Sequence, residues 1–146
     1  MNFLPPKSLS GLSEKQLYFV FRQLQKVSYC ANEYIFRQGE PPSHIYIVKS
    51  GQVKIVIESE EWPLEMCVFG VGECFGETSI IGIQRHSASA VAVGDTELIV
   101  FSRSALFSVF DSDKELFAML ILNIAREACR RLHKTDEILL HYVHKK

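Results

Sequence analysis

The sequence predicts an α+β domain: a sandwich or barrel-like roll of short strands, with a short helix before it and helices after it. Three observations carry this prediction. Residues 33–102 break into short β-rich segments between turns that contain glycine and proline. The segments on either side repeat apolar residues at helical spacing. The chain has 146 residues, of which 47% are hydrophobic, so residues 1–146 are expected to form a single domain with its own core.

The first helix is expected to begin after Ser13. Ser13 and Gln16 fit a capping box, and Leu12 and Leu17 are placed as a hydrophobic staple. From Leu17 onward, apolar residues repeat at helical spacing as far as Val27. We therefore expect this helix to end near Val27.

The β-roll is expected over residues 33–102. Its β-rich segments are residues 34–36, 44–49, 52–58, 65–69, 88–93 and 97–101. Ser50 and Gly51 separate the second segment from the third, and the alternation after Gly51 predicts a hairpin with one buried face. A turn at Gly94–Thr96 joins the last two segments.

Residues 104–144 are expected to be helical. After a short segment at residues 104–110, Asp111–Asp113 can cap a helix without proline or glycine. Seven of its residues follow the alternating spacing of a coiled-coil seam: Ile121, Ala125, Ala128, Leu132, Thr135, Leu139 and Tyr142. This seam packs on the roll or against a second copy of the chain, and its strict spacing favours a homodimer. Both can hold, along the first and second half of the helix.

Charge, hydropathy and cysteine content favour a cytoplasmic protein away from membranes. Sixteen Lys and Arg stand against 17 Asp and Glu, which argues against bulk electrostatic binding to nucleic acid or anionic lipid. No segment approaches the roughly 18–20 apolar residues of a membrane helix, and residues 1–7 do not resemble a secretory signal. Four cysteines without a C-x-x-C pair favour free thiols in a reducing compartment.

The motifs of common enzyme classes are missing from the sequence. Gly70 and Gly72 lack the third glycine of a dinucleotide-binding loop, and there is no P-loop and no G-x-S-x-G elbow. The five histidines form no metal-binding pair in a strand or helix. The sequence therefore predicts no enzyme, no metal site and no cofactor.

Residues 72–88 form a candidate anion-binding segment. A Gly–Glu pair at Gly76 and Glu77 leaves a strand and enters a helical turn, whose first N–H groups lack helical partners. Arg85 and His86 follow closely and can bring positive charge. Glu77 suits such a site if the ligand also carries a hydroxyl, since a carboxylate can accept from a ribose 2′-OH. The alternative is an ordinary bulge and turn with a solvated Glu77.

Three motifs resemble the cyclic-nucleotide-binding domain family, of the catabolite-activator and kinase-regulatory-subunit type. They are Tyr34-Ile35-Phe36-x-x-Gly39-Glu40, Ile45-Tyr46-Ile47-Val48-x-x-Gly51-x-Val53 and Gly72-x-x-Phe75-Gly76-Glu77. The resemblance covers about residues 17–140. It implies an antiparallel double-stranded, jelly-roll-like β-roll with a short N-terminal helix and a long C-terminal dimerisation helix.

The resemblance also implies a set of ligand-binding residues. Glu77 matches the glutamate that binds ribose. Residues 130–137 resemble the family segment whose Thr-Ser pair meets the purine, with Thr135 aligned to that threonine and Asp136 in the place of the serine. The full set is Phe75, Gly76, Glu77, Thr78, Ser79, Arg85, His86, Ser87, Ala88, Thr135 and Asp136. The implied ligand is a cyclic nucleotide, with cyclic AMP favoured over cyclic GMP.

One departure from the family pattern concerns the phosphate. The position of the phosphate-binding arginine holds His86, with Arg85 one residue earlier. Neutral histidine lacks the charged, bidentate fork of arginine, so losing that contact weakens binding by roughly one to two orders of magnitude. Arg85 either reaches into the site through a shift of the loop or faces water.

The expected function is that of a non-enzymatic regulatory or sensor module that regulates an unidentified protein partner. No helix-turn-helix follows the last helix in the sequence, so we expect no DNA binding by this chain alone. Two alternatives stay open. One is a dimeric protein-interaction domain that keeps the fold without binding nucleotide, and the other is the effector domain of a truncated transcription regulator.

Overall fold

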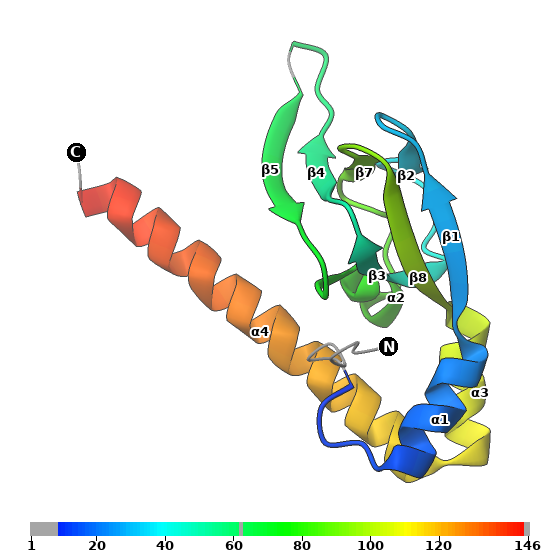
Figure 1. Ribbon diagram of the computed structural model, residues 1–146. Coiled ribbons are helices and arrows are strands. Elements are labelled where there is room, and N and C mark those ends of the chain that lie inside the picture. The colour runs from blue at the N-terminus through cyan, green and yellow to red at the C-terminus, as the bar shows by residue number, and fades with distance from the viewer. Residues whose placement is uncertain (1–8, 62, 145–146) are drawn as a thin grey trace.

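The computed structural model describes residues 9–61 and 63–144, without the side chains of Thr78 and His144. Its strands form two four-stranded antiparallel sheets that face each other (Figure 1). The first sheet has the order β1 (Gln25–Tyr29), β8 (Thr96–Ser102), β3 (His44–Ser50), β6 (Cys74–Phe75). The second has the order β2 (Tyr34–Phe36), β7 (Ser89–Ala92), β4 (Val53–Ile57), β5 (Leu64–Phe69). The predicted β-roll is therefore confirmed.

Helices gather at one end of the roll. They are α1 (Glu14–Gln23), α3 (Arg103–Ser112) and the first part of α4 (Lys114–His144), and the rest of α4 extends away from the roll (Figure 1). The predicted capping box at Ser13 and Gln16 is present, and Asp113 caps α4 by accepting from the N–H of Leu116 at 3.0 Å. None of the described helices is long and apolar enough to cross a membrane.

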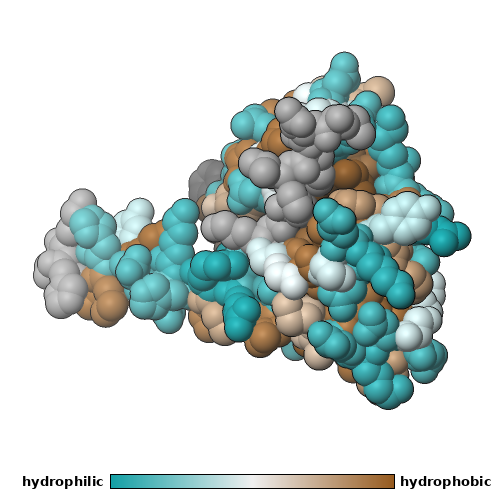
Figure 2. Space-filling view, turned by 60° about the horizontal axis from the view of Figure 1, so that its bottom comes forward, coloured by the Kyte–Doolittle hydropathy of each residue, from teal (hydrophilic) through white to brown (hydrophobic). Residues whose placement is uncertain are grey.

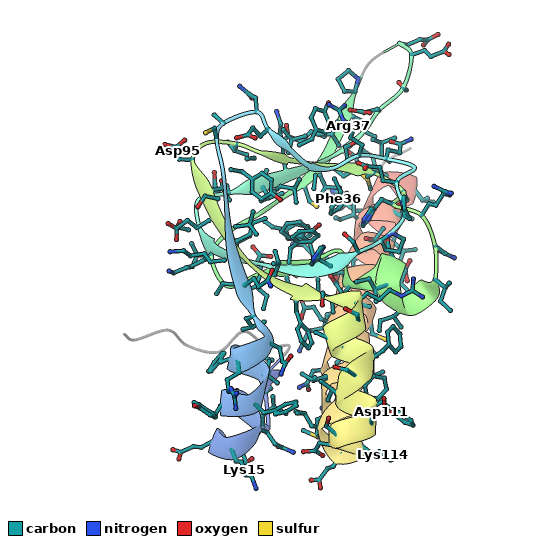
Figure 3. The ribbon with its side chains drawn as sticks, turned by 90° about the vertical axis from the view of Figure 1, so that its right-hand side faces the viewer. Lys15, Phe36, Arg37, Asp95, Asp111 and Lys114 are labelled. Carbon is teal, nitrogen blue, oxygen red and sulfur yellow. The ribbon has the colours of Figure 1, made fainter. Side chains whose placement is uncertain are left out.

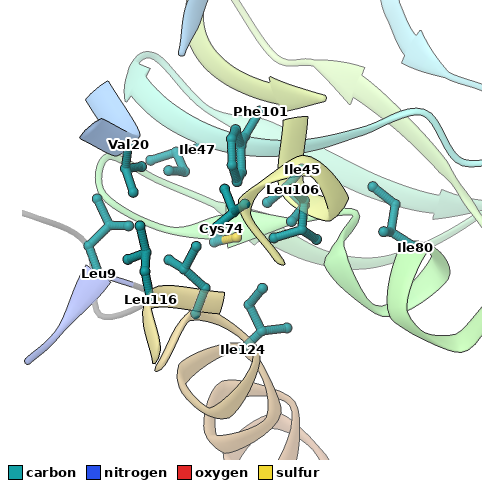
Figure 4. Packing of buried hydrophobic residues seen from close by; sticks show 12 residues of the cluster. Leu9, Val20, Ile45, Ile47, Cys74, Ile80, Phe101, Leu106, Leu116 and Ile124 are labelled. Atoms are coloured by element: carbon teal, nitrogen blue, oxygen red, sulfur yellow. The ribbon is translucent and has the colours of Figure 1, made fainter. Parts of the chain in front are cut away.

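Strand β3 is buried on both faces and separates two hydrophobic clusters. Ile45 and Ile47 pack with the helices, in a cluster that includes Leu106, Leu116 and Ile124 (Figure 4). The alternate residues Tyr46 and Val48 point between the sheets. The roll is thus anchored to the helices through β3, together with Cys74 of β6 and Phe101 of β8.

The first helix is shorter than predicted. It ends at Gln23, because Leu24 adopts an extended conformation and the chain enters β1. Val27 pairs with Leu98 of β8 in that strand, so the prediction of a helix ending near Val27 was wrong and the roll begins at residue 25 instead of 33. The apolar residues up to Val27 fit a helical repeat, but the last of them lies in a strand that pairs with residues about 70 positions later. A local repeat carries no information about such a distant partner.

The hairpin predicted at Gly51 was also wrong. Strands β3 and β4 belong to different sheets, and the chain crosses between the sheets at Gly51. A second crossing, from β7 to β8, lies beside it: a Cβ on Gly51, whose φ is +85°, would lie 2.5 Å from the carbonyl oxygen of Asp95. Glycine therefore permits two sheet crossings to pack together.

The long helix α4 uses two adjacent faces differently. Leu116, Leu120 and Ile124 are buried against the roll and the other helices. The predicted seam lies one residue further round the helix, and beyond Ile121 its large apolar members Leu132, Leu139 and Tyr142 are exposed. Figure 2 shows apolar and polar side chains side by side on the projecting end of the molecule. The roll thus covers the neighbouring face and leaves most of the seam open.

Candidate functional site

The segment between β6 and β7 begins with a turn that requires glycine. Gly76 has a φ of +83° and precedes the short helix α2 (Glu77–Gly82). A Cβ at Gly76 would lie 3.1 Å from the carbonyl oxygen of His44 and 3.1 Å from a ring carbon of Tyr46. This turn directs Glu77 into the interior, where the residue is only 1% exposed. The alternative of a solvated Glu77 is therefore wrong.

A pocket of about 230 Å³ lies between this segment and the second sheet. The segment forms one wall, β2, β4 and β5 form the other, and α4 contributes Arg131. The volume far exceeds the roughly 15 Å³ that one water molecule needs, so the pocket can admit an organic ligand. Of the candidate residues, the pocket brings together Phe75, Gly76, Glu77, Ser79, His86, Ser87 and Ala88.

Aromatic rings build the floor of this pocket. Phe75 stacks on Phe69 with ring centres 5.6 Å apart and on Tyr46 at 5.1 Å. Phe36 lies inside the roll while its neighbour Arg37 points outward (Figure 3), and the Phe36 ring packs against both Tyr46 and Phe75. Rings fixed on four strands make a preformed apolar surface, against which a few polar groups can orient a ligand.

Glu77 forms an ion pair with Arg131 of α4. Nη1 of Arg131 donates to Oε1 of Glu77 at 2.6 Å, and Nη2 donates to the carbonyl oxygen of Cys74. The guanidinium also lies 4.8 Å from the ring centre of Phe69. Burial raises the pKa of the Glu77 carboxyl above its ordinary value, and the positive charge of Arg131 opposes this rise.

Among the described side chains, the second carboxylate oxygen of Glu77 faces only a weak donor, and the backbone N–H of Glu77 also hydrogen-bonds to the carboxylate. Its Oε2 lies 3.8 Å from the thiol of Cys74, which donates to it. A thiol is a poor donor, so this oxygen retains its capacity to accept a hydrogen bond from a ligand hydroxyl. The site therefore offers a carboxylate that is held on one side and available on the other.

His86 occupies the pocket wall that faces β2. The residue is 4% exposed, and its ring stacks on Phe36 with centres 3.6 Å apart and planes inclined by 9°. The backbone N–H of His86 donates to the carbonyl oxygen of Glu40 at 3.0 Å, and the backbone carbonyl of His86 accepts from the N–H of Gly39 at 2.8 Å. Burial lowers the pKa of the imidazole, and the negative charge of Glu40 opposes this effect. The imidazole is therefore neutral at pH 7.

Four candidate residues are placed differently. Arg85 is exposed and donates to the carbonyl oxygen of Gly39 at 2.8 Å, outside the residues that line the pocket. Thr135 and Asp136 are exposed on α4, where the hydroxyl of Thr135 bonds to the carbonyl of Arg131 at 3.0 Å. The side chain of Thr78 lies outside the described part of the structure. The pocket is thus assembled without Arg85 and without the two α4 residues.

Sequence reasoning missed Arg131 as a pocket residue. In the sequence, Arg131 stands in a basic cluster with Arg126, Arg130 and Lys134, and the nearby Glu127 and Asp136 favour a solvated helix face for such a cluster. Arg130 does pair with Glu127, at 2.7 Å. Arg131, however, lies seven residues after the buried Ile124 and eleven after the buried Leu120, on the face that packs against the roll. This spacing, combined with a candidate buried carboxylate at Glu77, was the available signal.

Comparisons with known proteins agree with this geometry. The sequence model of the cyclic nucleotide-binding domain matches residues 26–113. The cyclic AMP receptor protein of Thermus thermophilus is 31% identical over 129 residues, covering 86% of this chain and 57% of that protein. The cGMP-dependent protein kinase egl-4 of Caenorhabditis elegans is 35% identical over 95 residues, covering 63% of this chain and 12% of the kinase.

A solved structure shows the same architecture. The crystal structure of the Thermus thermophilus catabolite activator protein matches with a TM-score of 0.79 and 29% identity, over 91% of this chain and 61% of that one. The chain thus spans little more than half the length of the Thermus protein. Because the family model covers most of the chain, including both walls of the pocket, the chain belongs to the cyclic nucleotide-binding domain family.

Proposed function

We propose that this domain binds a cyclic nucleotide, with cyclic AMP preferred to cyclic GMP, and acts as a non-enzymatic regulatory module. One observation carries the proposal: the pocket encloses a buried carboxylate, Glu77, beside two hydroxyls and an imidazole. An acceptor next to hydrogen-bond donors suits a ligand that combines a sugar hydroxyl with a phosphate ester. The name of the Thermus relative supports cyclic AMP as the ligand.

The pocket suggests how each part of the ligand is held. Oε2 of Glu77 accepts from the ribose 2′-OH, because Arg131 already occupies Oε1. The hydroxyls of Ser79 and Ser87 line the pocket without a partner among the described residues, and with the ring of His86 they donate to the phosphate. Because none of these donors is a bidentate guanidinium, the phosphate is held more weakly than it would be by an arginine.

We propose that α4 contacts the purine base of the ligand and transmits the effect of binding to a partner. Thr135 and Asp136 lie outside the pocket, so contact with the purine requires α4 to move toward the ligand. Arg131 connects that helix to Glu77. Ligand binding at Glu77 therefore biases the position of α4, which we propose forms a homodimer and presents a surface to a protein partner. The four free cysteines support a cytoplasmic location, which cell fractionation tests.

A second candidate is a protein-interaction domain that binds no nucleotide. It is favoured by the ion pair between Glu77 and Arg131, since the pocket already satisfies its own carboxylate. On this hypothesis the pair is a structural element and the pocket stays empty. Because the chain covers 57% of its Thermus relative, either activity also fits the effector domain of a larger regulator.

Thermal unfolding with a nucleotide panel separates these candidates. A ligand that binds only the folded state stabilises it, by about 2.7 kcal/mol at a concentration of 100 times Kd. We expect millimolar cyclic AMP to raise Tm by several degrees, cyclic GMP to raise it less, and linear AMP, which cannot present the cyclic ester, to leave it unchanged. If the Tm with each of the three nucleotides equals that of the protein without ligand, the result supports the interaction domain instead.

A further inference from the structure

The charges in the pocket leave one group that can change its protonation near neutral pH. Among the described lining residues, the titratable side chains are Cys67, Glu77, His86 and Arg131. Glu77 and Arg131 pair at 2.6 Å and neutralise each other. Burial raises the pKa of the Cys67 thiol, which keeps it neutral. A ligand anion therefore finds no uncompensated positive charge unless the imidazole of His86 takes up a proton.

The surroundings of His86 can hold the protonated form. Phe36 covers one face of the ring, and an aromatic face attracts a cation. The charged or titratable groups on the elements around the ring are Glu40 after β2, Arg85 beside it in the chain, Tyr46 and His44 on β3, Glu77 on α2 and Arg131 on α4. Of these, Arg85 is directed to the carbonyl of Gly39 and Arg131 to Glu77, so Glu40 supplies the main field on the imidazole.

We propose that His86, positioned by its stack on Phe36, couples binding of the nucleotide anion to the uptake of one proton from solvent, so that the domain responds to its ligand and to acidity together. This inference rests on the proposed function. In the free protein the residue is buried and its ring stacks on Phe36, and this burial favours the neutral imidazole. With a phosphate bound beside it, the charged ring gains an ionic hydrogen bond and the proton stays on the imidazole.

Linkage fixes the direction of the pH dependence. The free protein has a His86 pKa below the ordinary 6.5, and the nearby anion raises that pKa in the complex. Between these two pKa values the complex holds about one proton more than the free protein. Affinity therefore falls about tenfold for each pH unit of increase across that window. Outside the window affinity is constant.

Calorimetric titration of the full chain with cyclic AMP from pH 5.5 to 8.0 tests this coupling. Two buffers of different ionisation enthalpy give the number of protons taken up. We expect the wild type to take up close to one proton at pH values inside the window, and the fall in affinity to be reproduced in each buffer. His86→Arg should bind more tightly above pH 7 with a flat profile, and His86→Gln should bind weakly with a flat profile.

Phe36→Leu tests the positioning role of the ring stack. We expect it to keep the pH dependence but to shift the window to lower pH, because the imidazolium loses its aromatic contact. Thermal unfolding without ligand identifies any variant that fails to fold. If Phe36→Leu or His86→Gln fails, the comparison of wild type with His86→Arg still tests the coupling. A wild-type affinity that is flat across the range, with no proton uptake, overturns the inference but leaves the proposed function intact. Absence of binding by wild type and His86→Arg at every pH overturns both.

Discussion

Replacing Arg131 with methionine should lower the free energy of unfolding by about 3 kcal/mol, because it leaves the buried carboxylate of Glu77 without its partner. We take the lower end of the range for broken buried pairs, since the Arg131 side chain retains 30% exposure. The matched control is Arg130→Met. Arg130 pairs with Glu127 at the surface, so its loss should cost less than about 1 kcal/mol. Urea unfolding monitored by circular dichroism measures both values.

The pH dependence of this loss identifies its cause. Without Arg131, the effect of burial on Glu77 loses its main opposing charge, and the folded-state pKa of the carboxyl rises further above its unfolded value. A raised folded pKa stabilises the protein below the unfolded value and loses that effect as pH rises through the folded value. The loss in free energy of unfolding caused by Arg131→Met, relative to the wild type, should therefore be small at pH 4.5 and largest at pH 7–8. In the double variant Glu77→Gln, Arg131→Met most of the loss should be recovered. A pH-independent deficit, or equal losses at both arginines, would contradict the buried ion pair.

Introducing a charge on the exposed seam of α4 should convert the proposed dimer into a monomer. Leu132 and Leu139 lie on the seam and are 63% and 58% exposed, although large apolar side chains in a coiled-coil spacing are normally buried against a partner. Leu139→Asp places a charge in the proposed interface. We expect light scattering after size exclusion, at tens of micromolar protein, to show half the wild-type mass for this variant.

Leu140→Asp is the control for this experiment. Leu140 is also 58% exposed, but it lies outside the seam spacing, so the same chemical change should leave the dimer intact. If the wild type is a monomer at this concentration, or if both variants dissociate equally, the seam is not the interface.

The parts of the fold that sequence reasoning predicted are those with local signals. The capping box at Ser13, the cap at Asp113 and the turn at Gly76 each depend on a few consecutive residues, and the structure has all three. The end of α1 and the crossing at Gly51 depend instead on which strand the next segment pairs with. Pairing partners are far apart in the sequence, so periodicity alone could not choose them.

The same distinction holds for the site. The segment from Phe75 to Ala88 is contiguous, and half of its residues line one pocket. Arg131 lies 54 residues after Glu77, and its role follows only from the way α4 crosses the roll. Its sequence neighbour Arg130 remains at the surface, which shows that a one-residue change on a helix decides between a solvated charge and a buried ion pair.

Titration of the wild-type protein with cyclic AMP and with 2′-deoxy cyclic AMP, at pH 6, tests most directly whether Glu77 in this pocket holds a ribose. The deoxy analogue keeps the base and the cyclic ester and lacks only the hydroxyl that donates to the carboxylate. Losing a hydrogen bond to a charged group costs about 1.5–3 kcal/mol, so the account predicts that cyclic AMP binds roughly 10- to 100-fold more tightly than the analogue. Equal affinities for the two compounds, or no binding of cyclic AMP at millimolar concentration, would contradict it.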